Sequence, residues 1–373
     1  MNIPTVSLVK CNSYDCLQVV EAVRRSVELL GGVSAFVRPR SSVLVKPNLL
    51  MAKEPSYCID THPEVVRAVV RLLKDINCRI YLGDGPSLLG RKEDVEEEVY
   101  EKSGMKEVAR SEGIELVRFD KRRWRRNFPF TSWLDTCQHV VSVPKFKTHQ
   151  LTTLTGAVKN LFGLITGTYK TELHLKHYNL EEFCKIIVDI YEEVRPSLTV
   201  IDGVMALEGD GPGTSGKPRH CGLVLAGADC VALDSVLAKV MGIEPLDVPT
   251  TKAAAARLLG ESRLEKIAIA GDPLEDFLGR PFKLPQASLV NKLPPPLIKM
   301  AKRLVKHYPR ISDEKCIRCQ ACIQVCPNKA ISMHKERVVI DYKRCIACFC
   351  CQESCPASAI QLKRSILAYI MGI

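Results

Sequence analysis

The feature that most constrains this chain is a cysteine repeat close to its C-terminal end. The pattern C-x2-C-x2-C-x3-C-P occurs twice, with the second copy displaced by 29 residues, and it accounts for eight of the 17 cysteines. A disulfide framework is typical of short secreted chains, whereas this chain has 373 residues. The repeat therefore predicts a metal centre. Eight further cysteines are scattered singly before residue 300, and we expect them to remain reduced and buried.

The spacing within each copy favours iron–sulfur clusters. Three cysteines at two-residue gaps allow one tight loop to present three thiolates to a single [4Fe–4S] cube, and the fourth cysteine begins a short helix that points toward the other cube. Zinc is the alternative, but zinc ribbons use separated C-x2-C pairs. Cys350 lies outside the pattern, and we interpret it as a packing residue. The predicted ligands are Cys316, Cys319, Cys322 and Cys355 for cluster 1, and Cys345, Cys348, Cys351 and Cys326 for cluster 2.

Composition and charge narrow the class of protein further. Apolar residues make up 46% of the chain and charged residues 25%, which is ordinary for a globular protein. The formal charge of +11 falls to roughly +7 when each cluster contributes about −2, and a basic surface favours acidic partners or anionic substrates. The chain has no apolar run long enough for a transmembrane segment and no signal-peptide pattern at its start, so we expect a cytoplasmic protein.

The region before the cysteine repeat has the pattern of an α/β domain. Short apolar runs alternate with helical patterns at residues 63–74 and 180–194. This alternation predicts a mainly parallel sheet with helices on both faces. The predicted strands are residues 5–9, 43–45, 80–82, 116–119, 140–143, 198–201, 223–226 and 267–270.

Polar side chains follow several of these predicted strands. Because open α/β sheets bind ligands beyond the carboxyl ends of their strands, we expect one shared cleft there. Histidine ordinarily titrates near neutrality, which makes His149 the predicted proton donor, although a loop histidine satisfied by backbone is the alternative. The lysines would hold negative charge, and the aspartates would orient His149, accept a proton or bind a metal. The predicted catalytic residues are His149, Lys145, Lys147, Asp84 and Asp202, and the predicted substrate-binding residues are Lys46, Asn48, Lys159, Asn160 and Glu208.

Two phosphate-binding patterns are present only in part. The segment 211–217 fits G-x4-G-K, but Pro218 stands where a P-loop needs Ser or Thr, and a predicted strand follows instead of a helix. The glycines at 83 and 85 follow a strand, but Leu88 replaces the third glycine of a dinucleotide-binding fingerprint. We therefore expect neither a nucleotide-hydrolysing loop nor a nicotinamide site.

Taken together, the strings after the strands resemble a family, the domain of unknown function 362, over about the first 275 residues. The resemblance implies an α/β domain associated with iron–sulfur redox proteins, and it implies no substrate. Residues 311–362 resemble bacterial-type two-cluster ferredoxins, which implies low-potential transfer of one electron per cluster. The strings that carry the first resemblance are Lys46-Pro47-Asn48, Gly83-Asp84-Gly85-Pro86, Pro144-Lys145-Phe146-Lys147-Thr148-His149, Lys159-Asn160-Leu161-Phe162-Gly163 and Glu208-Gly209-Asp210-Gly211-Pro212.

The predicted domain order follows from these resemblances and from the prolines at 294–296. We expect an α/β domain at 1–285. A Pro-rich basic linker should follow at 286–310, and it should include a helix at 297–307. A small α+β ferredoxin-like domain at 311–362 and an apolar tail at 363–373 complete the chain. The basic linker is interpreted either as a solvated connector or as a docking surface for an acidic electron carrier.

Three functions are compatible with these features. The leading hypothesis is an iron–sulfur oxidoreductase, in which a soluble electron donor or acceptor protein exchanges electrons with the clusters and a small anionic substrate is reduced in the α/β domain. The alternative is a ferredoxin-type electron carrier whose α/β domain only docks a partner enzyme. A third reading rests on residues 121–126, where five cations surround Trp124, as in some nucleic-acid contacts. Such a run is usually a charged loop, so we do not expect a nucleic-acid partner.

Overall fold

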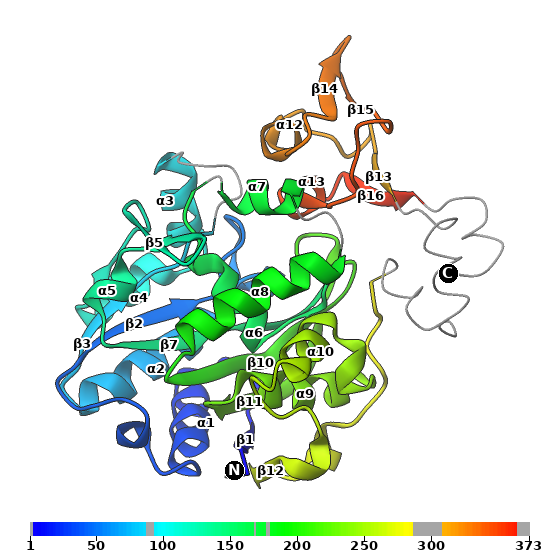
Figure 1. Ribbon diagram of the computed structural model, residues 1–373. Helices are drawn as coiled ribbons and strands as arrows, with labels where there is room; N and C mark the ends of the chain where they lie inside the picture. The colour runs from blue at the N-terminus through cyan, green and yellow to red at the C-terminus, as the bar shows by residue number, and fades with distance from the viewer. Residues whose placement is uncertain (1–2, 87–92, 168, 177–179, 286–307, 364–373) are drawn as a thin grey trace.

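The structure is a computed structural model that describes residues 3–86, 93–167, 169–176, 180–285 and 308–363 (Figure 1). A ten-stranded sheet runs through the α/β body, in which β8 (Lys145–His149) and β9 (Thr153–Thr155) lie beside β10. The order of the other strands is β12 (Ala268–Gly271), β1 (Thr5–Lys10), β11 (Gly216–Gly227), β10 (Leu198–Gly209), β7 (His139–Val143), β2 (Ser42–Pro47), β3 (Arg79–Leu82) and β4 (Glu115–Leu116).

Most neighbouring strands of this sheet run parallel, as predicted. β2 pairs in parallel with β3 and with β7, and β10 continues the parallel run beside β7. β11 is antiparallel to both of its neighbours, β10 and β1. Parallel strands covered on both faces are continuously apolar, and β2 accordingly has Val43, Leu44 and Val45 fully buried.

Helices cover both faces of the sheet and create two hydrophobic cores. Alternate residues of one strand point to opposite faces, so Leu44 belongs to one core while Val43 and Val45 belong to the other. The core of Val43 is closed by α1 (Cys16–Glu28), α2 (Pro63–Asp75) and α4 (Met105–Glu112). The core of Leu44 is closed by α6 (Ala157–Asn160), α8 (Leu180–Val194), α9 (Cys230–Met241) and α10 (Pro249–Ala256).

The predicted helices at 63–74 and 180–194 are confirmed as α2 and α8, but several strand limits differ from prediction. β10 and β11 each span 12 residues, because they continue as a long antiparallel pair beyond the predicted strands at 198–201 and 223–226. β4 is shorter than the predicted 116–119. Residues 145–149, expected as a loop, form β8. The remaining elements of the body are α3 (Glu93–Lys102), β5 (Arg122–Arg125), β6 (Phe128–Thr131), α5 (Trp133–Thr136) and α7 (Tyr169–Lys176).

The cysteine repeat folds into a small α+β module built from two similar halves. β13 (Tyr308–Ile311) pairs with β16 (Ile360–Lys363), and β14 (Ile331–His334) forms a hairpin with β15 (Arg337–Ile340). The short helices α12 (Ala321–Val325) and α13 (Cys350–Glu353) follow the first and second cysteine loops. In Figure 1, α13 lies on the side of the module next to the body, whereas α12 and the β14–β15 hairpin project away from it.

The module begins earlier than the predicted boundary of 311, because β13 starts at Tyr308 and pairs with the last strand of the module. The predicted linker helix at 297–307 and residues 364–373 of the predicted apolar tail lie outside the described residues. Within the described ranges, none of the helices combines the length and the apolar character needed to cross a membrane.

Candidate functional site

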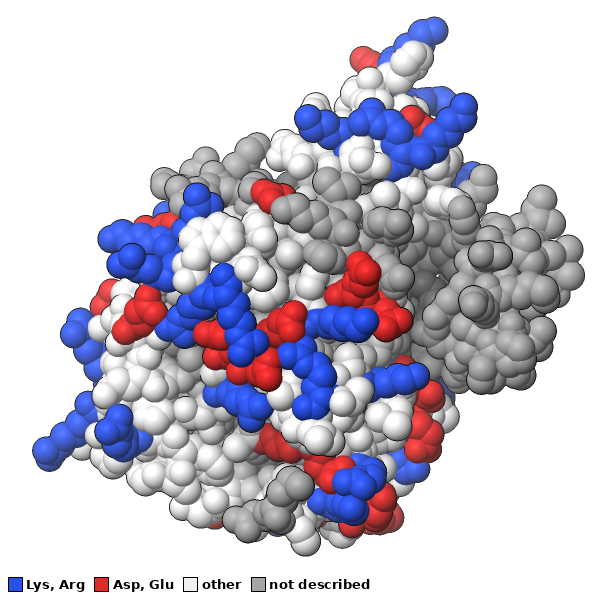
Figure 2. Space-filling model, in the orientation of Figure 1, with Lys and Arg blue, Asp and Glu red and all other residues white. Residues whose placement is uncertain are grey.

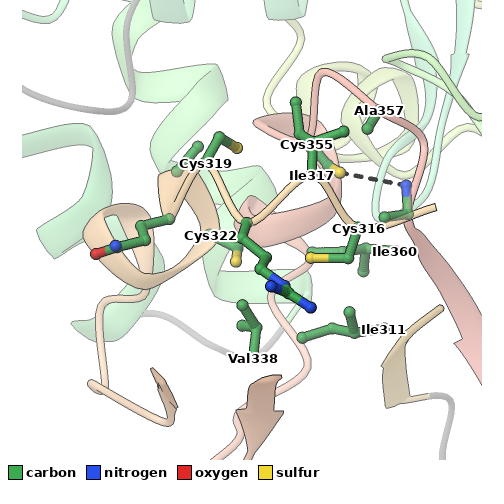
Figure 3. A pocket seen from close by; sticks show the side chains of 13 residues that line it. Ile311, Cys316, Ile317, Cys319, Cys322, Val338, Cys355, Ala357 and Ile360 are labelled. Atoms are coloured by element: carbon green, nitrogen blue, oxygen red, sulfur yellow. Dashed lines mark hydrogen bonds between the residues drawn. The ribbon is translucent and has the colours of Figure 1, made fainter. Parts of the chain in front are cut away.

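Two cavities in the module are each lined by four of the repeat cysteines. The first is shown in Figure 3, where the four cysteines lie around a space that is closed by apolar side chains such as Val338 and Ile360. Each cavity takes three cysteines from one copy of the repeat and the fourth from the other copy, so the structure brings together the two predicted quartets. The quartets are Cys316, Cys319, Cys322 and Cys355 in the first cavity, and Cys345, Cys348, Cys351 and Cys326 in the second.

The backbone of both cysteine loops turns in the same way. Arg318 and Gln320 have positive φ angles of 57° and 63°, and the equivalent residues of the second copy, Ala347 and Phe349, have 54° and 60°. These left-handed positions let a short loop curl so that its thiols face one point, which costs energy for residues other than glycine. Both three-cysteine loops therefore contain the same backbone strain at equivalent positions.

The fourth cysteine of each copy is also held in an equivalent way. Cys326 Sγ accepts a hydrogen bond from Ala330 N at 3.1 Å, and Cys355 Sγ accepts one from Ala359 N at 3.3 Å. Backbone N–H donors near cluster sulfurs stabilise thiolate ligands and adjust their potential. Four thiols in an apolar pocket with such donors fit a [4Fe–4S] cluster in each cavity.

In the body, Lys46 near the end of β2 and Asp84 after β3 form a buried ion pair. Lys46 Nζ lies 2.7 Å from Asp84 Oδ1, and it donates hydrogen bonds to Pro47 O and to Asn160 Oδ1. Asn48 Nδ2 donates to the same Asn160 oxygen at 3.2 Å. Burial lowers the pKa of Lys46, and Asp84 opposes that shift. The structure thus brings four predicted residues together, but Lys46 is already neutralised by Asp84.

A second buried ion pair joins β8 to β10. Lys145 Nζ lies 2.8 Å from Asp202 Oδ2, while Tyr14 OH donates to Asp202 Oδ1 at 2.7 Å. The ring of Tyr14 stacks on His62 with 3.5 Å between ring centroids. Tyr14 and His62 belong to this site, and sequence reasoning missed both, because neither follows a predicted strand. Burial, the main cause, lowers the pKa of His62 to about 4.

Lys147 and Lys159 form a third group, together with Asp60. Lys147 Nζ donates to Ile59 O at 2.6 Å, and Asp60 Oδ1 accepts from Leu50 N at 2.6 Å. Burial lowers the pKa of Lys147 and raises the pKa of Asp60, and each charge opposes the shift of the other. Burial also lowers the pKa of Lys159. Sequence reasoning missed Asp60, so the predicted surplus of cations is smaller than expected.

His149 lies at the end of β8, where the module contacts the body. Its Nδ1 accepts hydrogen bonds from Leu151 N and Thr152 N, so the proton of the neutral ring resides on Nε2, which lies 3.2 Å from Glu353 Oε1 of the module. Burial, followed by the charge of Lys159, lowers the pKa of His149 to about 4. The sequence-based expectation of a near-neutral proton donor therefore needs correction, because the buried ring is uncharged at neutral pH.

Glu208 is placed apart from these groups by its contacts. It accepts hydrogen bonds from Arg219 Nη1 at 3.0 Å, Arg280 Nη2 at 2.8 Å and Lys283 N at 3.0 Å. These contacts fix the segment at 280–283 against β10 and β11. The predicted substrate contact of Glu208 remains a prediction.

The basic run around Trp124 is largely compensated by acids. Arg125 Nη2 lies 2.5 Å from Asp135 Oδ1, and Arg126 Nη1 lies 2.9 Å from Glu192 Oε2. Figure 2 likewise shows Lys and Arg interspersed with Asp and Glu over this face of the body. Paired cations of this kind attract phosphate less strongly than an uncompensated patch does.

The fold and the two cysteine quartets define an α/β protein that carries a ferredoxin-like iron–sulfur module. Residues 43–239 match the family described as Domain of unknown function (DUF362), and the chain belongs to that family. Residues 308–356 match a 4Fe-4S dicluster domain, which supports [4Fe–4S] binding and electron transfer by this module.

Proteins similar to this chain include one curated relative and one solved structure. The chain is 32% identical over 258 residues to Thylakoid-associated protein sll1697 of Synechocystis sp., and the alignment covers 67% of this chain and 78% of that protein. The lactate racemase apoprotein of Thermoanaerobacterium thermosaccharolyticum has a TM-score of 0.40 and 12% identity. That match covers 65% of this chain and 58% of the other, which is less than two thirds of its length.

Proposed function

We propose that the protein is a reductase that binds two [4Fe–4S] clusters and passes single electrons to a small anionic substrate at the edge of the sheet. The observation that carries this proposal is the 3.2 Å approach of Glu353 in the module to His149 in the body. Through this approach, the second cysteine loop lies near Lys147 and Lys159, whose charges interact with that of Glu353. When bound, each cluster would supply one electron at a time.

The buried groups of the body suit the remaining tasks of such a reaction. Lys147 and Lys159 are the cations that would hold a carboxylate or phosphate, since Lys46 and Lys145 are held in direct ion pairs, whereas Asp60 and Glu353 act on Lys147 and Lys159 through their charge. Asp60 and Lys147 have pKa values moved by burial toward neutrality, which suits groups that exchange a proton at physiological pH. A two-electron reduction would then take two electrons from an external one-electron donor protein and two protons delivered through these groups.

The proposal is tested by reducing the anaerobically prepared protein with dithionite, removing the excess, and offering small carboxylates and phosphates as oxidants. Lys147→Met should abolish reoxidation by the active compound, because the substitution removes both a buried cation and a proton carrier. The matched control is Lys185→Met on α8, where the lysine side chain is 58% exposed. Reoxidation by proteins only, with no small molecule active in the unsubstituted chain, would contradict the reductase proposal.

The second candidate is a pure electron carrier, and one observation favours it. The first cysteine loop is open to solvent, with Cys319 exposed and Ile317 66% exposed. An exposed cysteine ligand beside an apolar side chain is suited to contact with another redox protein. The reoxidation experiment distinguishes the two functions. A cytoplasmic location remains a prediction.

A further inference from the structure

The two halves of the module are equivalent in spacing, yet they differ in burial. Gln320 and Gln324 of the first half are exposed, whereas their counterparts 29 residues later, Phe349 and Glu353, are 3% and 5% exposed. Residues 317–320 are all exposed, whereas their counterparts 346–349 are half-buried or buried, and residues 349–353 are all buried, whereas their counterparts 320–324 include the exposed Gln320 and Gln324. A repeat whose copies differ in this way has one half turned toward a partner surface, and here that surface is the body.

The contacts between module and body come from the second half. Glu353 Oε1 approaches His149 Nε2 at 3.2 Å. Thr214 Oγ1 donates to Cys355 O at 2.9 Å, and Ser358 Oγ donates to Thr214 O at 3.0 Å. Cys355 belongs to the first quartet, so both cavities reach this contact, but the three-cysteine loop nearest to it is that of the second copy.

Glu353 is the charged residue of this contact, and its surroundings are basic. Its charge interacts with those of Lys147 on β8 and Lys159 on α6. The Nε2 of His149 carries the proton of the neutral ring, because Nδ1 accepts from backbone N–H groups, and this Nε2 lies 3.2 Å from Glu353 Oε1. A carboxylate buried against cations and a ring N–H is held in one orientation, whereas a glutamine, as at the equivalent Gln324, would lack the charge.

We propose that Glu353 is a positioning residue, which seats the second cysteine loop on the cation-lined edge of the sheet and leaves the first loop facing solvent. The reason for such positioning rests on the proposed function, since a reaction at the edge of the sheet needs a cysteine loop close to it. Its physical content is independent of the substrate. In the bound state, the cluster of the second loop would lie nearer to the site than the cluster of the first loop.

The test uses the full chain loaded with its clusters and compares Glu353→Gln with the matched variant Gln324→Glu, which changes the equivalent residue of the first half. The first readout is hydrogen exchange of the amides at 149–153 and 350–355. We expect at least a tenfold rise in their exchange rates for Glu353→Gln and no change for Gln324→Glu. Lys159→Gln removes a body-side charge that interacts with Glu353, so it should also raise the amide exchange rates of residues 350–355.

The second readout is the reduction potential of each cluster. This potential depends on the charge of the residue at 353, whereas a purely structural role would not make it do so. Loss of the buried negative charge in Glu353→Gln should raise one of the two potentials, and Glu353→Asp, which keeps the charge, should leave it close to the original value. Unchanged exchange in Glu353→Gln, or an equal effect of Gln324→Glu, would overturn the proposal. Altered exchange in a protein that no small molecule reoxidises would leave the positioning role intact and refute the reductase function.

Discussion

Lys145 Nζ and Asp202 Oδ2 lie 2.8 Å apart at the join between β8 and β10, and the exposed fractions of their side chains are 1% and 0%. The contact connects two residues that are 57 positions apart in the chain. Tyr14 OH binds both partners, because it accepts a hydrogen bond from Lys145 Nζ and donates one to Asp202 Oδ1. Two charges removed from water require each other, because either one alone would lie unpaired in a low-dielectric interior.

Replacing Lys145 by methionine should therefore destabilise the protein by about 3–5 kcal/mol, since Asp202 is left as an uncompensated buried charge. The measurement is urea unfolding followed by far-UV circular dichroism. The control is the exposed pair Arg24–Asp75, also 2.8 Å long, where Asp75→Asn should cost at most about 1 kcal/mol. Similar losses for the two variants would contradict the assigned role of burial.

Asp234 gives a prediction about pH. Burial raises the pKa of this carboxyl from 3.8 to about 7, and hydrogen bonds from Ala157 N and Val158 N oppose the shift. Between pH 4 and 7 the folded state retains a proton that the unfolded state releases, so this group makes stability fall as pH rises through that window.

Asp234→Asn should remove that contribution, which amounts to at most about 1.4 kcal/mol per pH unit. The comparison is the slope of unfolding free energy against pH for the variant and the unsubstituted protein. Asp189→Asn, at a half-buried aspartate on α8, is the control for the same change of side chain. A slope insensitive to Asp234→Asn would mean that the carboxyl is ionised throughout this range.

Gly163 tests the buried pair of Lys46 and Asp84. A Cβ at this position would lie 2.7 Å from Lys46 Nζ and still closer to Asp84 Oδ1, so Gly163→Ala forces the pair apart. We expect a loss of about 1–3 kcal/mol in thermal or urea unfolding. Gly279→Ala serves as the control, because a Cβ there meets no atom within 4 Å. Equal stabilities of the two variants would contradict the close packing at Gly163.

The interleaved quartets are tested with pairs of serine substitutions. Cys326→Ser combined with Cys345→Ser removes two ligands of one cavity, so the chain should retain one cluster and about four iron atoms. Cys326→Ser combined with Cys316→Ser disturbs both cavities and should lose both clusters. Iron and sulfide analysis with electron paramagnetic resonance provides the measurement. The reverse pattern would show that each copy binds its own cluster.

Cys350→Ser is the matched control for these variants, because Cys350 is fully buried but lines neither cavity. It should retain about eight iron atoms. A loss of iron in this variant alone would identify Cys350 as a ligand.

Several parts of the fold were predictable because their signals are local. The apolar runs predicted the strands at the centre of the sheet, since β2, β3 and β7 are short and buried on both faces. The limits of β10 and β11 were not predictable in this way, because the outer half of β11 is polar and is held by pairing with β10. Likewise, residues 145–149 become a strand because β10 and β9 pair with them.

By itself, the sequence determined the cysteine quartets and the α/β character of the body. Both signals are local: one is the spacing of thiols in a loop, and the other is the alternation of apolar runs. They can therefore be recognised without information on distant segments. Only the tertiary structure decided which lysines are neutralised, that His149 is uncharged, and that Glu353 rather than Gln324 faces the body. Desolvation and ion pairing decide these properties, and both depend on segments far apart in the chain.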